Sequence, residues 1–179
     1  MKTTGITIGT ASILVGAAIV VIDLLLGEKI GLGTILNMLF IGAFLDLILM
    51  LGVIPLAPGL VIGVAMLTAG LFIIALGSYF YIDSGFGAGP RDSLMVAVTR
   101  KTKLPVGVCR AAIELTAVAV GWFMGGMAGV GTIISAFGIG FCIQLTFKVL
   151  KFDVTAVRHE TLMQTYRSLL AVIRKSFNK

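Results

Sequence analysis

Five apolar segments, each long enough to form a membrane-spanning helix, constrain the fold of this chain most. They cover Ile6–Leu26, Ile30–Leu51, Leu60–Ile82, Pro105–Met124 and Val130–Leu150. A helix needs about 20 apolar residues to cross a hydrocarbon layer about 30 Å thick. The chain is 58% hydrophobic and 12% charged, whereas soluble domains are about 25% charged. The sequence therefore predicts an all-α integral membrane protein with five transmembrane helices.

The segment 84–103, between the third and fourth spans, has a different character. Its charged residues are Arg91, Asp92, Arg100, Lys101 and Lys103. Each charge at the centre of a membrane helix costs about 2.5 to 3.5 kcal/mol, so this segment cannot span. Only Leu94–Val98 is strongly apolar. We therefore expect a short helix that is either interfacial or re-entrant.

A pattern of glycine and polar residues occurs twice in the chain, 98 residues apart. The motif Gly-x-Gly-Thr-Ile opens the second span at Gly31 and the fifth span at Gly129. Further pairs at the same offset are Gly9 with Gly107, Asn37 with Ser135, Gly42 with Gly140, and Asp46 with Gln144. Duplicated halves are common in membrane carriers. The pattern therefore predicts a protein built from two homologous halves.

The distribution of positive charge predicts how the spans are oriented. Lysine and arginine gather before the fourth span and after the fifth, whereas the loops 52–59 and 125–129 carry no charge. Positively charged ends face the cytoplasm. We therefore expect a cytoplasmic C-terminus and an N-terminus on the outside. Because 84–103 does not cross, the two halves then face opposite ways, as an inverted-topology repeat.

This repeat divides the chain into three parts. Residues 1–56 form a first half with two spans, 57–152 form a second half with three spans and the segment 84–103, and 153–179 form an amphipathic cytoplasmic tail. The tail is expected to lie near the anionic inner leaflet. The first half is shorter than the second. Three explanations stay open: a truncated start, a natural five-span protein, or a dimer in which a second copy fills the gap.

Polar residues inside apolar segments are costly in lipid, so each is a candidate for function. Arg110 and Glu114 are four residues apart and share one helix face. They predict either a structural pair near the cytoplasmic end or a proton or cation site at Glu114 gated by Arg110. Asp46 and Gln144 suggest a pseudo-symmetric pair that has diverged. Asp23, near the cytoplasmic end of its span, is expected at the interface.

Two kinds of glycine motif are further candidates. In the run 85–92, three glycines precede Pro90, which fits the first turn of a helix. Arg91 beside the positive end of that helix favours an anionic group, and Asp92 partly offsets it. The Gly-x-Gly-Thr motifs lack the third glycine or the lysine of nucleotide loops. They indicate either tight turns capped by Thr34 and Thr132 or sites for an anion.

Glycine also forms a stripe in the third span, at Gly63, Gly70 and Gly77. A seven-residue spacing is close to two helical turns, so the three lie on one face. Small residues let helices approach closely in lipid. We expect this face to pack against another helix, and a sliding contact is the alternative.

Several motifs together resemble the YczE/YyaS/YitT family of small bacterial integral membrane proteins. They are Gly87-Ala88-Gly89-Pro90-Arg91-Asp92-Ser93-Leu94, Gly121-Trp122 followed by Gly125-Gly126, and Gly129-Val130-Gly131-Thr132. The resemblance covers roughly residues 5–165 and implies a multi-pass protein of the bacterial cell membrane. Family members usually carry an additional N-terminal span with its own glycine-proline-aspartate segment. The short region 153–179 fits the YczE-like branch, which has no separate cytosolic domain.

We expect a small secondary transporter, or a transport-related protein, with a small polar or anionic solute. Candidate path residues are Asn37, Asp46, Arg91, Asp92, Arg110, Glu114, Ser135 and Gln144. Candidate backbone motifs are Gly31, Gly33, Thr34, Gly87, Gly89, Pro90, Gly129, Gly131 and Thr132. The alternative is a non-transporting membrane factor that assembles with a partner protein. We expect the lipid bilayer and a second copy as partners, and no enzyme activity, metal, cofactor or nucleic acid.

Overall fold

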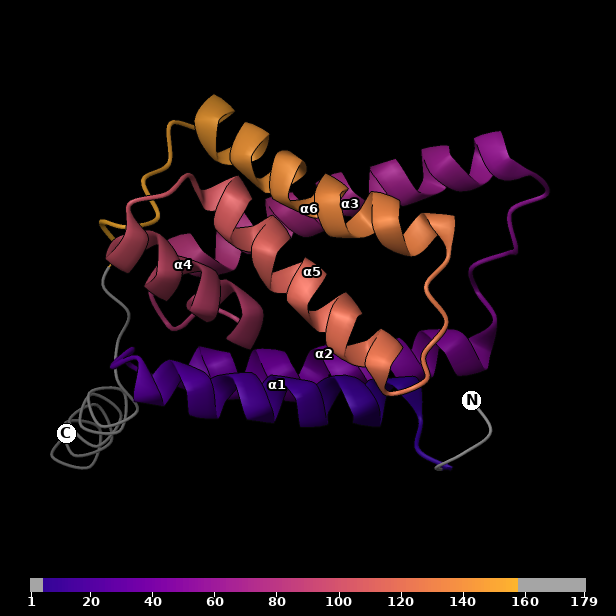
Figure 1. Cartoon of the computed structure of the whole chain (residues 1–179), viewed down its shortest axis with the longest axis horizontal. Helices are drawn as coiled ribbons and strands as arrows, with labels where there is room; N and C mark the ends of the chain where they lie inside the picture. The colour runs from indigo at the N-terminus through magenta and orange to yellow at the C-terminus, as the bar shows by residue number, and fades with distance from the viewer. Residues whose placement is uncertain (1–4, 158–179) are drawn as a thin grey trace, which may run out of the picture.

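The computed structural model describes residues 5–157, which form six helices and no strand (Figure 1). The helices are α1 (Ile8–Leu25), α2 (Leu32–Leu51), α3 (Leu60–Asp83), α4 (Pro90–Thr102), α5 (Val106–Phe123) and α6 (Val130–Val149). All except α4 are long and apolar enough to cross a membrane. Their ends lie within two residues of the expected spans. The all-α membrane fold is therefore confirmed.

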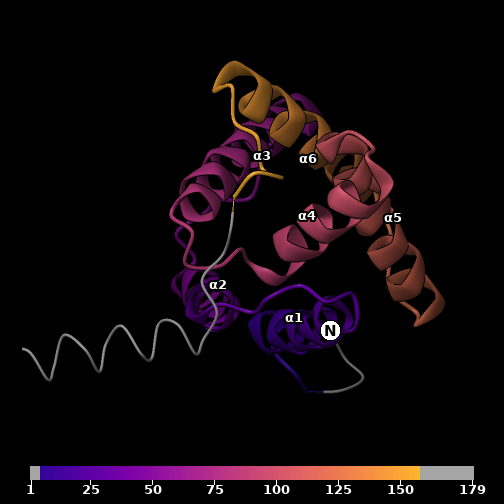
Figure 2. The ribbon, with the colours of Figure 1, turned by 90° about the vertical axis from the view of Figure 1, so that its left-hand side faces the viewer.

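The helices form two hairpins with a short helix between them. α1 packs along α2, α5 packs along α6, and α3 packs along α6. α4 contacts α1, α2 and α5, and it lies near the middle of the arrangement in the end-on view (Figure 2). Along the long axis of Figure 1, α1 and α5 run in opposite directions, as do α2 and α6.

The outer faces of the long helices are apolar. Residues that are more than 80% exposed include Leu25, Met50, Val61 and Phe123. An apolar surface this extensive is rare on a soluble monomer, but it is the surface that lipid chains solvate. The exposed apolar faces therefore agree with embedding in a bilayer.

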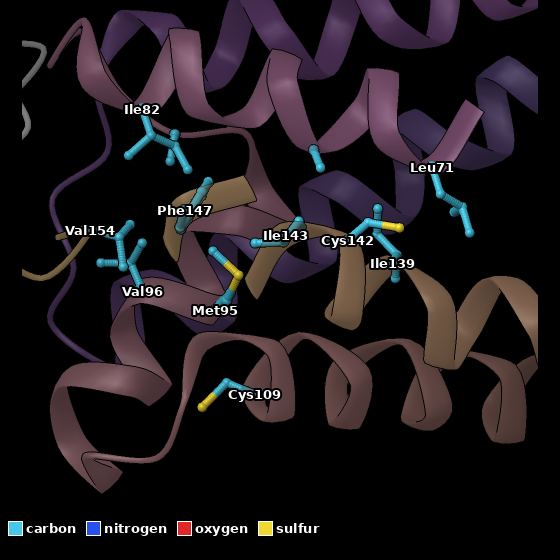
Figure 3. Close-up of a cluster of buried hydrophobic side chains, with 12 residues drawn as sticks. Leu71, Ile82, Met95, Val96, Cys109, Ile139, Cys142, Ile143, Phe147 and Val154 are labelled. Atoms are coloured by element: carbon cyan, nitrogen blue, oxygen red, sulfur yellow. The ribbon is translucent and has the colours of Figure 1, made fainter. Parts of the chain in front are cut away.

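A buried apolar cluster holds α4 against α3, α5 and α6 (Figure 3). Ile82, Met95 and Ile143 are fully buried, and each comes from a different helix. Cys109 and Cys142 are buried free thiols in the same cluster, as expected for small packing residues. This cluster fixes one side of α4 and so fixes the polar groups at its start.

α4 begins midway along α1 and ends level with the C-terminal end of α1. It begins at Pro90, in its first turn, and Pro90 lies beside Gly16 in the middle of α1, where an added Cβ would be 3.6 Å from the proline ring. Its last turn lies at the end of α1, because Arg100 pairs with Glu28 at 3.0 Å. A 13-residue helix rises about 20 Å. α4 therefore runs from mid-depth of the bundle to one end, a position that agrees with the re-entrant alternative.

The two hairpins make the same internal contacts at positions 98 residues apart. A Cβ on Gly9 would overlap the carbonyl oxygen of Gly42, and a Cβ on Gly107 would overlap that of Gly140. The N–H of Gly9 donates to Asp46 Oδ1 at 2.7 Å. At the equivalent place, the N–H of Gly107 donates to Gln144 Oε1 at 2.8 Å. Glycine is required at these positions because the helix backbones touch.

The expected glycine stripe of α3 has no helix packed on it within residues 5–157. An added Cβ at Gly70 or Gly77 would have no atom within 4 Å, and one at Gly63 would meet only Ala57, at 3.5 Å. The predicted packing is therefore not made by the part of the chain that the structure describes.

The start of the region after α6 forms a tight turn. Asp153 accepts hydrogen bonds from the Thr155 hydroxyl at 2.6 Å and from its N–H at 2.9 Å. These bonds hold the pKa of Asp153 below its usual value. Residues 158–179, with His159 and most of the predicted amphipathic tail, lie outside the described residues.

Candidate functional site

A buried ion pair joins the start of α4 to the start of α5. Arg110 Nη1 donates to Asp92 Oδ1, and Ser78 of α3 donates to Asp92 Oδ2 at 2.9 Å. The Asp92 and Arg110 side chains are only 4% and 7% exposed. Asp92 lies in the first turn of α4, where the helix dipole favours a carboxylate. Three helices therefore meet at this one carboxylate.

The network continues along α5 and back to α4. Arg110 Nη2 pairs with Glu114 Oε1 at 2.9 Å, so the predicted i,i+4 contact is present. Arg91 Nη1 reaches the same Glu114 carboxylate at 3.4 Å. The Arg110 side chain is buried and bonded to Asp92, so it does not extend to the surface. Two cations and two anions alternate in the chain Asp92–Arg110–Glu114–Arg91.

A pocket of about 240 Å³ lies beside this network. Its polar lining consists of Ser12, Asn37, Tyr81, Arg91, Asp92 and Arg110, and its other lining residues are Gly16, Met38, Ile41, Ile74, Gly89 and Pro90. These residues come from α1 to α5 and from the turn before α4. Because Pro90 and Gly16 line it together, the pocket lies at mid-depth of α1. The start of α4 thus faces a partly open pocket, and membrane proteins tolerate irregular backbone where it lines such a space.

The first Gly-x-Gly-Thr motif holds the turn that precedes α4. The N–H of Gly33 donates to the carbonyl of Phe86 at 3.1 Å, and an added Cβ there would lie 3.0 Å from that oxygen. Gly87 has a φ of +128°, and its Cβ would lie 2.8 Å from Thr34 Oγ1. The motif starts α2, as predicted, but its glycines are also needed for close contact with the turn. Sequence spacing alone did not indicate this contact.

The second motif has a different environment. An added Cβ at Gly129 or Gly131 would meet no atom within 4 Å. Thr132 Oγ1 accepts the N–H of Gly129 at 3.3 Å, as a cap, and Ser135 donates to the Thr132 carbonyl at 2.9 Å. All four residues lie outside the pocket lining. Within the described chain, the two copies share sequence and a helix start but not a covering turn.

Asp46 and Gln144 also lie outside the pocket lining. Each accepts a backbone N–H at the start of the neighbouring helix, at Gly9 and Gly107 respectively. Asp46 Oδ2 also accepts the Thr7 hydroxyl at 2.5 Å. The structure therefore gives this pair a capping role, and neither side chain joins the predicted path.

The remaining candidates converge at the start of α4. Those that line the pocket are Asn37, Gly89, Pro90, Arg91, Asp92 and Arg110. Glu114 joins them through its two arginine contacts, and an added Cβ on Gly89 would lie 2.6 Å from Asn37 Oδ1. Gly31 is the N-cap residue of α2, at the neighbouring helix start.

Three polar residues of the site, Ser12, Ser78 and Tyr81, were not predicted from the sequence. Ser12 and Tyr81 line the pocket, and Ser78 bonds both Tyr81, at 3.1 Å, and Asp92. In the sequence, each of them is a polar residue inside an otherwise apolar span. A hydroxyl in such a place is weaker evidence for a functional site than a charged group is. Asp23 was expected at the interface, but it is fully buried.

Comparison with known sequences shows where this fold belongs. The profile of the Family of unknown function (DUF6198) matches residues 1–148. The chain belongs to this family. It is 36% identical over 143 residues to the uncharacterized membrane protein YczE of Bacillus subtilis (strain 168), and 31% identical over 149 residues to an uncharacterized protein of Haemophilus influenzae (strain ATCC 51907 / DSM 11121 / KW20 / Rd). No solved structure matches the chain significantly.

Membership of the DUF6198 family confirms the YczE-like resemblance. The two alignments cover 79% and 82% of this chain. The chain spans 66% of the length of each relative, so less than two thirds. With five apolar helices, the family assignment supports a multi-pass membrane protein.

Proposed function

We propose that the protein is a small secondary transporter whose solute binds in the pocket at the start of α4. The observation that carries this proposal is the position of that pocket, which has several polar and charged side chains in its lining and lies at mid-depth beside the start of α4. Secondary transporters place their sites near the bilayer midplane, at the ends of discontinuous helices. The same pocket holds four of the residues that the sequence predicts for a solute path, namely Asn37, Arg91, Asp92 and Arg110.

A small anion is the solute class that fits the pocket best. Its volume of about 240 Å³ lies below the range of about 300–1,000 Å³ for drug-sized ligands. The start of α4 contributes a partial positive charge, and Arg91 and Arg110 add two cations. Asp92 and Glu114 balance these cations, so the empty site is close to neutral.

Arg91 is the residue that would engage the anion. Its contact with Glu114 is the longest in the network, at 3.4 Å, and its side chain is 41% exposed. Arg110, by contrast, is 7% exposed and bonded to two carboxylates. Arg91 can therefore exchange its contact with Glu114 for a contact with a solute at little cost in free energy. Arg110 stays bonded and maintains the geometry of the site.

The proposal includes an inverted repeat in the bacterial cell membrane. The matched contacts of the two hairpins and the opposite directions of their helices support this assignment. The charge-free loops 52–59 and 125–129 would then face outward, with Glu28 and the C-terminal region in the cytoplasm.

A flux assay with purified, reconstituted protein tests the proposal. Efflux and uptake would be measured in proteoliposomes with chloride, formate, acetate, sulfate and inorganic phosphate as probes. We expect saturable flux of at least one probe, strongly reduced in Arg91→Gln. Lys101→Gln is the matched control, because Lys101 lies on the same helix, is exposed, and does not line the pocket. No saturable flux of any probe, or equal flux in both variants, would count against an anion site at Arg91.

A non-transporting membrane factor is the second candidate. The observation that favours it is the glycine stripe of α3, which has no helix on it among residues 5–157. Such a stripe suits close contact with a helix of another protein. Co-purification of a stoichiometric membrane partner, together with an absence of flux, would favour this function over transport.

A further inference from the structure

Asp23 is a buried carboxyl group that the proposed solute site does not use. It lies in the last turn of α1 and is 0% exposed. Within residues 5–157, neither of its oxygens has a hydrogen-bond partner. The side chain that faces it is Ser93 of α4. Asp23 therefore lies in the contact between α1 and α4, facing the Ser93 hydroxyl but without a hydrogen bond of normal geometry.

No described cation neutralises this carboxyl. The charged group that acts on Asp23 is Glu28, which is also acidic. Arg100 of α4 is engaged elsewhere, with Glu28 at 3.0 Å and the Val157 carbonyl at 2.5 Å. α2, which also packs on α1, has Asp46 as its one charged residue, and that carboxylate caps the opposite end of α1.

An ionised carboxylate in such a place is strongly disfavoured. Burying an isolated charge costs far more than burying a neutral group, and the usual outcome is that the group is neutralised. Ionisable residues inside membrane segments commonly belong to ion or proton pathways. Of the ions available to an oxygen site with one acidic group, a proton alone removes the charge without further ligands.

We propose that Asp23 is a proton-binding site that couples protonation to the contact between α1 and α4. With a proton bound, the carboxylic acid can donate to the Ser93 hydroxyl, and the two helices pack as observed. When the proton leaves for water, the carboxylate needs water or a cation. The contact between α1 and α4 must then open, or Arg100 must leave Glu28.

This site is linked to the pocket through α4. Ser93 follows Asp92, which pairs with Arg110 beside the pocket. A movement of α4 away from Asp23 would therefore shift Asp92 and Arg91 as well. In a transporter, the proton at Asp23 would be the coupling ion. That last step rests on the proposed function, whereas the proton site itself does not.

Infrared spectroscopy of the full chain in lipid vesicles tests the proton site. The C=O stretch of a protonated carboxyl is followed from acid to alkaline pH. We expect a band that persists at neutral pH, where solvated carboxyls are ionised, and that disappears in Asp23→Asn. Asp46→Asn is the matched control and should keep the band. Absence of the band from the wild-type protein, or its persistence in Asp23→Asn, would overturn the proposal.

A second measurement needs no variant. Labelling with ¹³C-carboxyl aspartate should shift the band, whereas labelling glutamate should not, which separates Asp23 from Glu28 and Glu114. An unshifted band would also overturn the proposal. If the band behaves as expected but no probe anion is transported, the proton site stands and the transporter proposal fails. Coupled transport requires, in addition, that Asp23→Asn abolishes acceleration of flux by a pH gradient.

Discussion

Gln144 of α6 accepts the backbone N–H of Gly107 at the start of α5, with 2.8 Å between the two atoms. Asp46 and Gly9 make the same contact 98 residues earlier, at 2.7 Å. In both hairpins, a side-chain oxygen from the second helix satisfies a backbone donor at the start of the first. Such donors have no partner within their own helix. The polar side chain therefore fixes the register of each hairpin where the glycine backbones touch.

Removal of this acceptor should loosen one hairpin. We expect Gln144→Ala to lower the free energy of unfolding by about 1 kcal/mol, because the donor N–H of the buried residue Gly107 loses its partner. Gln144→Glu keeps an oxygen in place and should retain most of the stability. The measurement is thermal unfolding of detergent-solubilised protein, followed through the fluorescence of Trp122. Equal losses in the two variants would show that the acceptor oxygen is not what stabilises the hairpin.

The sequence could pair Asp46 with Gln144 but could not assign their role. A polar residue inside an apolar span is energetically costly in lipid. That cost is explained equally well by a functional role or by a structural partner. The partner here is a backbone N–H on another helix, which no residue type reveals. Spans were easier to predict, because length and apolar content are properties of each segment alone.

The two Gly-x-Gly-Thr motifs allow a matched comparison. Gly33→Val would place a side chain against the Phe86 carbonyl, where even a Cβ lies at 3.0 Å. Gly131→Val has the same helix position and meets no atom of the described chain within 4 Å. Both variants carry the same change in helix propensity, so that contribution cancels. We expect Gly33→Val to reduce folded yield and thermal stability clearly more than Gly131→Val.

The same comparison tests whether the surface around Gly131 is uncovered in the functional protein. If Gly131→Val is as damaging as Gly33→Val, the face is covered in the working protein. Size-exclusion chromatography with light scattering on both variants would then show whether a second copy supplies the cover. A monomer with normal stability would agree with an open face.

Removal of one partner of the buried pair Asp92–Arg110 should lower the free energy of unfolding substantially. Asp92→Ala leaves a guanidinium with one carboxylate fewer inside the bundle, and truncating one partner of a buried pair costs about 3 to 5 kcal/mol. Because Glu114 still contacts Arg110, we expect a loss of about 3 kcal/mol, near the lower end. The double variant Asp92→Ala/Arg110→Met should recover part of this loss. Additive losses in a double-mutant cycle would contradict a coupled pair.

This pair also marks the limit of sequence-based prediction of the site. The contact of Arg110 with Glu114 follows from their i,i+4 spacing, and the structure contains it. Asp92 lies 18 residues before Arg110, on a different helix, so its choice of partner depends on how deeply α4 enters the bundle. The expected position of Asp23 failed for the same reason. An aspartate near a span end is usually solvated, and here α4 covers it.

The proposed inverted repeat makes a prediction about which side of the membrane each loop faces. If the hairpins face opposite ways, the loop between α1 and α2 lies in the cytoplasm and the loop between α5 and α6 lies outside. Single cysteines at Lys29 and Met127 report on these loops, since both residues are exposed. Buried Cys109 and Cys142 would be replaced by alanine to remove background labelling.

A membrane-impermeant maleimide applied to intact cells should label Met127→Cys and leave Lys29→Cys unlabelled until the membrane is opened. The physical reason is that Lys29 and the basic residues Arg100, Lys101 and Lys103 lie at the same end of the bundle, which the positive-inside rule places in the cytoplasm. Lys101→Cys, at the end of α4, is the control and should behave like Lys29→Cys. Labelling of Lys29→Cys and Met127→Cys from the same side would require the two hairpins to face the same way. The matched contacts of Gly9 and Gly107 would then no longer support an inverted repeat.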